Sequence, residues 1–70
     1  MNRILVPDST NIASIGYDQE TQTLEVEFIK GSLYQYFDVP QVVYEDFVSA
    51  DSKGKYLANK IKGNYRYARV

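Results

Sequence analysis

The strongest constraint on the fold is a pattern of alternating residues that ends in a tight turn. Within residues 23–28, three apolar side chains alternate with two acidic ones: Leu24, Glu25, Val26, Glu27 and Phe28. Such alternation is typical of a β-strand with one buried and one solvated face. A turn at residues 29–31 follows, and residues 32–37 are rich in strand-forming side chains. We therefore predict a β-hairpin here.

The length of the turn decides which face the two central tyrosines occupy. A two-residue turn at Lys30-Gly31 places Tyr34 and Tyr36 beside the glutamates on the solvated face. A three-residue turn places both rings on the apolar face, with Tyr34 opposite Val26. The longer turn needs a left-handed third residue, which Gly31 provides, whereas the shorter one forces Lys30 to positive φ. We predict that both tyrosines pack in the core; the alternative is that they are platforms for base stacking.

Three further elements are predicted: a strand at residues 12–17, a helix at 40–50 and a second helix at 53–62. Pro40 suits a first helical position. The first helix carries one apolar stripe, formed by Val43, Tyr44, Phe47 and Val48. Asp51 or Ser52 caps the second helix, and Gly63 ends it. The buried face of the second helix is expected to hold Gly54, Leu57, Ala58 and Ile61.

The predicted fold class is α+β: a three-stranded antiparallel β-meander, followed by two helices packed on one face and an extended C-terminal tail. Residues 1–70 form a single domain, because a chain of 70 residues has one small core. Residues 1–8 are expected to be a weakly ordered N-terminus. Residues 64–70 are a basic tail that is either an added strand or an extended arm.

The absence of two residue types excludes several kinds of site. The chain has neither Cys nor His, which excludes the usual zinc sites and His-based nucleophilic catalysis. Oxygen-only sites for magnesium or calcium stay open, but no acidic loop has the EF-hand spacing. We expect no cofactor, no metal and no catalytic residues. No stretch approaches the roughly 20 apolar residues of a membrane span, and the N-terminus lacks a signal-peptide core. The expected location is cytoplasmic, without a membrane partner.

Charge divides the chain into an acidic and a basic part. Residues 52–70 carry six basic side chains and no acidic one, whereas residues 1–51 carry all nine acidic side chains and two basic ones. Tyrosines lie within the basic part, and this composition favours single-stranded nucleic acid. The candidate nucleic-acid-binding residues are Lys53, Lys55, Tyr56, Lys60, Lys62, Arg66, Tyr67 and Arg69.

The candidate cations have a helical spacing. Lys53 and Lys60 are seven residues apart, as are Lys55 and Lys62, so each pair is expected on one side of the second helix. These cations would neutralise phosphates, while Tyr56 and Tyr67 would stack on bases.

Two other interpretations compete with nucleic-acid binding. A basic run is often only a solvated helix face, or a surface that docks a protein partner. Glu25 and Glu27 lie on one face of a strand and could be read as paired catalytic carboxylates. No pocket-forming residues accompany them, so we interpret them as the solvated face.

The chain also resembles a known family, the KTSC domain, a small module named for the C-terminal segment of some lysyl-tRNA synthetases. The resemblance covers about residues 9–69. It is carried by Ile12 with Gly16-Tyr17-Asp18, by Leu24-x-Val26-x-Phe28, by Gly31-x-x-Tyr34-x-Tyr36, by Val39-Pro40, and by Ala50-x-Ser52-x-Gly54-x-Tyr56 with Asn59, Ile61 and Tyr65. The resemblance implies a small α+β module without catalytic residues, and its attachment to a tRNA-handling enzyme suggests RNA as a partner. We expect a non-enzymatic binding module for RNA or single-stranded nucleic acid; the alternative is a protein–protein interaction module.

Overall fold

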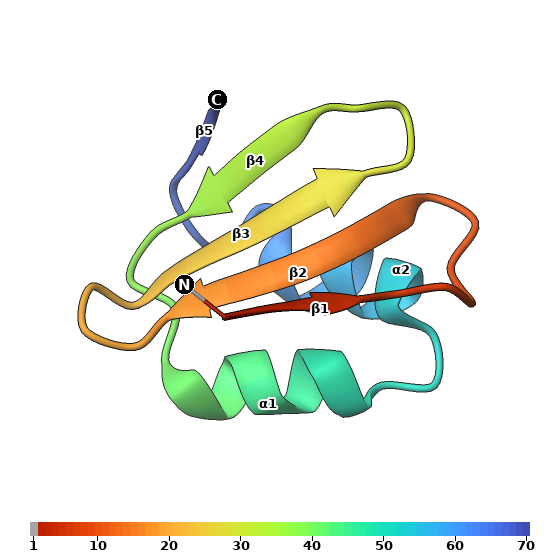
Figure 1. Cartoon of the computed structure of the whole chain (residues 1–70). Coiled ribbons are helices and arrows are strands. Elements are labelled where there is room, and N and C mark those ends of the chain that lie inside the picture. Colours follow the sequence, from red (N-terminus) through yellow and green to blue (C-terminus); the bar gives the residue numbers. More distant parts are fainter. Residues whose placement is uncertain (1) are drawn as a thin grey trace.

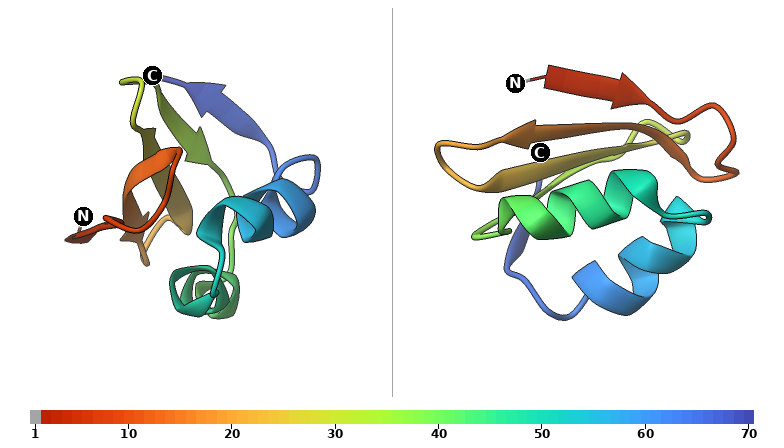
Figure 2. Two further views of the ribbon diagram at one scale, coloured as in Figure 1. Left: turned by 90° about the vertical axis from the view of Figure 1, so that its right-hand side faces the viewer. Right: turned by 90° about the horizontal axis from the view of Figure 1, so that it is seen from below.

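The protein consists of one antiparallel sheet with its helices on one face (Figure 1). The structure, a computed structural model, describes residues 2–70. The strands are β1 (Asn2–Leu5), β2 (Ile12–Asp18), β3 (Thr23–Phe28), β4 (Leu33–Tyr36) and β5 (Tyr67–Arg69). The helices are α1 (Gln41–Ser49), α2 (Lys53–Tyr56) and the π-helix η1 (Leu57–Ile61). The strands lie in chain order across the sheet, and Figure 2 shows the helices as a second layer.

The sheet has five strands rather than the three predicted. The additional strands, β1 and β5, are its two edges. Strand β1 forms where a weakly ordered N-terminus was expected and pairs with β2, although Met1 lies outside the described residues. Strand β5 forms in the tail and pairs with β4. Strand β1, of four residues, was not predicted, whereas β5, of three residues, matches the added-strand alternative for the tail. Their pairing supplies hydrogen-bond partners to the backbone groups along the outer edges of β2 and β4.

The hairpin between β3 and β4 has the predicted three-residue turn. The backbone N–H of Phe28 donates to the carbonyl of Ser32 at 2.9 Å, and Gly31 has φ +99°. Val26 lies opposite Tyr34, as expected. The prediction of a common face for the tyrosines and the apolar residues of β3 is therefore confirmed.

A β-bulge adjusts the pattern of β2. Ile12 lies opposite Phe28 and Ser14 opposite Glu27, which leaves Ala13 as an extra residue. Without the bulge, Ile12 and Ile15 would point to opposite faces, because they are three residues apart. With it, both side chains are fully buried in the core.

The helices confirm the predicted caps but not a regular second helix. Ser52 accepts a hydrogen bond from the Lys55 N–H at 3.3 Å, and Gly63 follows the helix with φ +83°. Between them, α2 gives way to the π-helix η1, which closes with a 2.8 Å bond from the Lys62 N–H to the Leu57 carbonyl. The predicted α-helix at residues 53–62 is therefore wrong in its second half. The wider turn also leaves Ala58 exposed rather than on the buried face.

The core lies between the sheet and the helices. Phe47 of α1 and two residues of η1, Leu57 and Ile61, are its helical members. Tyr17 of β2 is also buried; its ring stacks on Tyr44 with centroids 4.6 Å apart, and its hydroxyl donates to the Val39 carbonyl at 2.5 Å. The prediction that Tyr44 packs against the core is confirmed.

The two central tyrosines differ in burial, which predicts different contributions to stability. Tyr36 is 3% exposed, whereas Tyr34 is only half-buried. Tyr36→Ala should lower the free energy of unfolding by about 3–5 kcal/mol, the range for a packed aromatic ring. Tyr34→Ala should lower the free energy of unfolding by clearly less than Tyr36→Ala does. Urea unfolding followed by circular dichroism measures both values, and equal losses would contradict the observed packing.

Buried tyrosines also predict a loss of stability at high pH. Burial raises the pKa of Tyr17 above its ordinary value near 10, and the charge of Asp18 raises it further. A pKa that is higher in the folded state stabilises the protein fully below about pH 10, and this contribution is lost as pH rises through the folded-state pKa. Urea unfolding between pH 8 and 11 should therefore show a steeper loss for the wild type than for Tyr17→Phe. Parallel curves would show that Tyr17 is not responsible.

Candidate functional site

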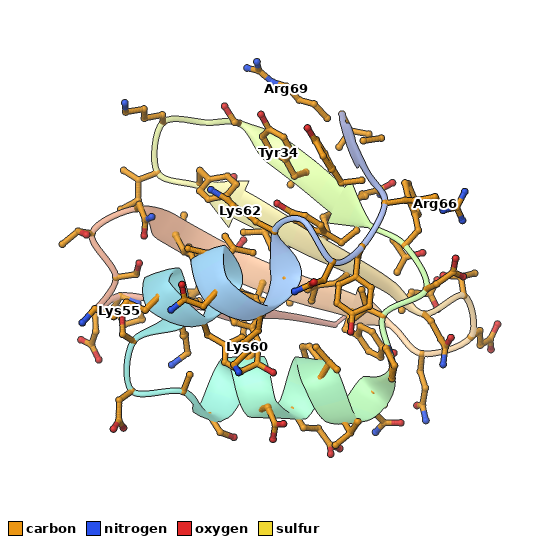
Figure 3. All side chains as sticks on the ribbon, turned by 180° about the vertical axis from the view of Figure 1, so that it is seen from behind. Tyr34, Lys55, Lys60, Lys62, Arg66 and Arg69 are labelled. Carbon is orange, nitrogen blue, oxygen red and sulfur yellow. The ribbon has the colours of Figure 1, made fainter. Side chains whose placement is uncertain are left out.

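The predicted cations lie around α2, η1 and β5, where Figure 3 labels five of them. Lys55 and Lys60 are exposed. Lys53 is partly buried, and its ammonium donates to the Ala50 carbonyl at 3.3 Å. Lys62 follows η1 in an extended conformation with ψ 130°. Lys62 therefore leaves the helix, and the predicted row of Lys55 and Lys62 is wrong, whereas Lys53 and Lys60 both lie within the helical segments.

Two arginines extend the basic surface along the tail. Arg66 forms an ion pair with Asp38 at 2.9 Å, and the side chains are 79% and 73% exposed. Arg69 donates to the Ser32 hydroxyl at 3.3 Å. An exposed ion pair contributes only about 0–1 kcal/mol, so breaking the contact with Asp38 costs Arg66 little.

The two predicted stacking tyrosines have different surroundings. Tyr56 is half-buried, and its ring stacks on Phe47 with centroids 5.6 Å apart. Burial raises the pKa of Tyr56, with smaller contributions from the charges of Asp46 and Tyr65. Tyr67, by contrast, is 61% exposed. Tyr67 is therefore open to a ligand, whereas Phe47 occupies one face of Tyr56.

A groove of about 820 Å³ lies beside Tyr67. Its walls come from the hairpin of β3 and β4, from β5, from the residues that follow η1 and from the loop before β2. The lining side chains that matter here are four aromatic and two basic: Phe28, Tyr34, Tyr36, Tyr67, Lys30 and Lys62. The groove exists because β4 and β5 extend beyond the two helices (Figure 2), which leaves part of the apolar face uncovered.

The aromatic rings of the groove contact one another. Phe28 meets Tyr34 edge-on, with centroids 5.7 Å apart and an interplanar angle of 90°. Tyr67 approaches Tyr34 and Tyr36 at 5.8 Å each. Burial raises the pKa of Tyr36, and the nearby charges of Tyr34 and Tyr67 add to the shift. The three phenol groups therefore lie close together.

The groove is positively charged. The Lys62 ammonium lies 5.9 Å from the centroid of the Phe28 ring, a cation–π geometry. Lys30 lines the groove as well, and no acidic side chain within residues 2–70 does so. Sequence reasoning identified Lys62 and Tyr67 as site residues and considered Tyr34 only as the alternative to its place in the core. It did not identify Phe28 or Lys30. The predicted hairpin register places Tyr34 on the same face as Phe28, and this was the available signal for these two residues. The register does not show how much of that face the helices cover.

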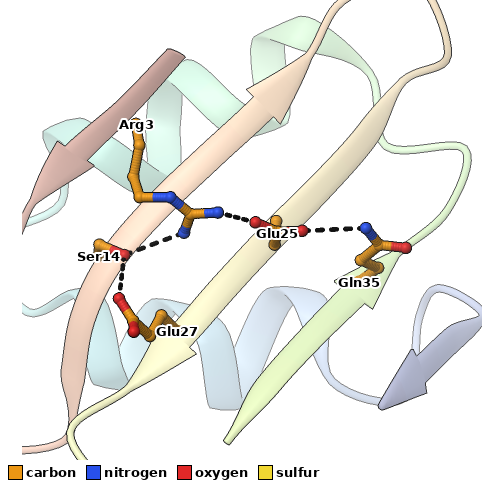
Figure 4. Close-up of polar contacts among 5 residues, drawn as sticks. All are labelled: Arg3, Ser14, Glu25, Glu27 and Gln35. Carbon is orange, nitrogen blue, oxygen red and sulfur yellow. Dashed lines mark hydrogen bonds and ion pairs between the residues drawn. The ribbon is translucent and has the colours of Figure 1, made fainter. Parts of the chain in front are cut away.

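The opposite face of the sheet carries a polar network (Figure 4). Glu25 pairs with Arg3 and accepts from the Gln35 amide at 2.9 Å. Arg3 also donates to the Ser14 hydroxyl at 3.0 Å, and this hydroxyl donates to Glu27 at 2.8 Å. Glu25 and Glu27 thus lie on the face away from the helices, as predicted, and partners from neighbouring strands engage both carboxylates. The prediction that this face is solvated is wrong for Glu25, which is only 9% exposed because Arg3 and Gln35 cover it.

Within the described part of the chain, no three acidic side chains come together as metal ligands. None of the helices described has the length and apolar character needed to cross a membrane.

Comparisons with known proteins place the chain in a family. The family profile of the KTSC domain matches residues 8–65. A lysine–tRNA ligase from Nostoc punctiforme is 42% identical over 67 residues, which are 96% of this chain but 12% of the ligase. An uncharacterized protein from Stutzerimonas stutzeri is 42% identical over 71 residues and matches along 99% of its length.

A solved structure agrees with this assignment. The crystal structure of a KTSC domain protein from Yersinia pestis matches with a TM-score of 0.90 and 38% sequence identity. The match covers 99% of this chain and 96% of the other. The order of strands and helices described above is thus shared with a KTSC protein over nearly its whole length, and the protein belongs to the KTSC domain family.

Proposed function

We propose that the protein is a non-enzymatic binding module that contacts RNA or single-stranded nucleic acid. The contact would be made by the basic surface, defined as the cations of α2, η1 and the tail: Lys53, Lys55, Lys60, Lys62, Arg66 and Arg69. The observation that carries the proposal is the composition of this surface. Its cations are mostly exposed, no acidic residue occurs from residue 52 onward, and the exposed Tyr67 lies between its arginines.

Physical chemistry supports nucleic acid as the partner. Phosphates attract clustered cations, and aromatic rings add stacking on bases. A lysine–tRNA ligase contains a segment 42% identical to this chain, and its name connects that protein with tRNA. The acidic part of the chain, with all nine Asp and Glu residues, would repel the same strand and limit affinity to about the micromolar range.

The first functional prediction is a strong dependence of binding on salt. If Lys60, Lys62, Arg66 and Arg69 each neutralise one phosphate, log affinity should fall against log salt with a slope of roughly −3. Raising the salt concentration from about 50 to 200 mM would then weaken binding some fifty-fold. Fluorescence anisotropy with tRNA and a labelled single-stranded oligonucleotide measures the slope. Failure of the folded protein to bind either ligand at low salt would refute the proposal.

A pair of charge-neutralising variants separates phosphate contact from general attraction. Lys60→Gln removes an exposed cation of the basic surface and should reduce the salt slope by about 0.7. Glu45→Gln removes an exposed anion from α1 and should strengthen binding slightly without changing the slope. Both side chains lie outside the core, so their circular dichroism spectra should match the wild type. A reduced slope for Glu45→Gln would contradict the proposed location of the contacts.

A protein–protein interaction module is the second candidate. Strand β5 is an edge of the sheet, and its three residues are all exposed. An extended peptide could add to such an edge through backbone hydrogen bonds. This function would be favoured if the protein binds no nucleic acid.

A further inference from the structure

The aromatic groove, lined by Phe28, Tyr34, Tyr36, Tyr67, Lys30 and Lys62, has features that the basic surface alone does not explain. Its volume of about 820 Å³ lies within the range of small-molecule pockets. Phosphate attraction requires only exposed cations. An aromatic wall next to those cations adds a second kind of recognition, which selects a planar ring.

The rings differ in how much they offer to a ligand. Tyr36 is 3% exposed and forms the floor, Tyr34 is half-buried, and Tyr67 is 61% exposed. Tyr67 lies against Tyr34 and Tyr36, so the buried rings support it. A flat ring that enters the groove can therefore stack on Tyr67 without displacing core packing.

The cations at the groove select an anionic ligand. Lys62 is directed toward the groove by its extended backbone after η1, and its ammonium lies 5.9 Å from the Phe28 ring centroid. Lys30 approaches from the turn of the hairpin. Because the groove has no acidic lining among residues 2–70, nothing there opposes a phosphate. An uncharged apolar peptide would make no use of these two cations.

We propose that the groove binds an unpaired base of single-stranded RNA or DNA, stacked on Tyr67, with the adjoining phosphate held by Lys62 and Lys30. This inference rests on the proposed function and names the site at which the nucleic acid is recognised. A base within a duplex is stacked between its neighbours and cannot enter the groove. The site therefore discriminates single strands from duplexes of the same charge density.

The test uses the full chain, a labelled single-stranded decanucleotide and the duplex of the same sequence. Tyr67→Ala should weaken single-strand binding about ten-fold, whereas Tyr67→Phe, which keeps the ring, should bind like the wild type. Stacking releases no counterions, so neither variant should change the salt slope. Duplex binding should not respond to either substitution.

Two lysines provide a matched control for charge. Lys62→Gln and Lys55→Gln each remove one exposed cation, but only Lys62 lines the groove. Lys62→Gln should weaken single-strand binding several-fold more than Lys55→Gln. Amide chemical-shift changes on adding the oligonucleotide should concentrate at Lys30, Ser32 and Gly63 and be small on α1.

The outcomes separate this inference from the broader function. If the oligonucleotide binds with the expected salt slope, but Tyr67→Ala matches Tyr67→Phe and the two lysine variants are equal, the groove is not the site and the proposed function stands. If neither oligonucleotide binds, both proposals are wrong. Circular dichroism of each variant should match the wild type, because the side chains of Tyr67, Lys62 and Lys55 are exposed.

Discussion

The three-residue turn between β3 and β4 is the constraint on which the rest of the structure depends. Gly31 takes the left-handed conformation, and the bond from Phe28 to Ser32 closes the turn. A slip of one residue would move every side chain of β4 to the other face of the sheet. The core would lose Tyr36, and the aromatic groove would lose Tyr34. Both rings would instead lie beside Glu25 and Glu27 on the opposite face of the sheet.

One apolar face of the sheet both forms the core and lines the aromatic groove, because the helices cover only part of it. Helix α1 and the α2–η1 segment supply few core side chains, which suits a chain of 70 residues. Beyond their reach, Tyr67 keeps 61% of its surface exposed. Exposed apolar surface of this kind commonly marks a binding site. The adjacent cations, Lys30 and Lys62, give this surface its affinity for anions.

The candidate site was only partly predictable. Composition identified the basic segment and Tyr67, because charge segregation is visible in the sequence itself. It could not show that Tyr56 stacks on Phe47 or that Lys53 donates to the Ala50 carbonyl, since these contacts depend on how the helices pack. The sequence predicts correctly which face of the sheet Tyr34 occupies, and that face was taken to be core throughout. The sequence does not show that the helices leave part of this face uncovered.

Local interactions account for what the sequence determined by itself. Alternation, turn geometry and capping act over a few residues, and they specified β2, β3, β4, the hairpin register, helix α1 and a cap at Asp51 or Ser52. Long-range contacts decided the remainder. Strands β1 and β5 are held by pairing with the outer edges of β2 and β4, and the bulge at Ala13 places Ile12 and Ile15 in the same core. Whether an aromatic side chain became part of the core or of the groove depended on how much of the sheet the helices cover, and this is set by long-range packing rather than by a local pattern.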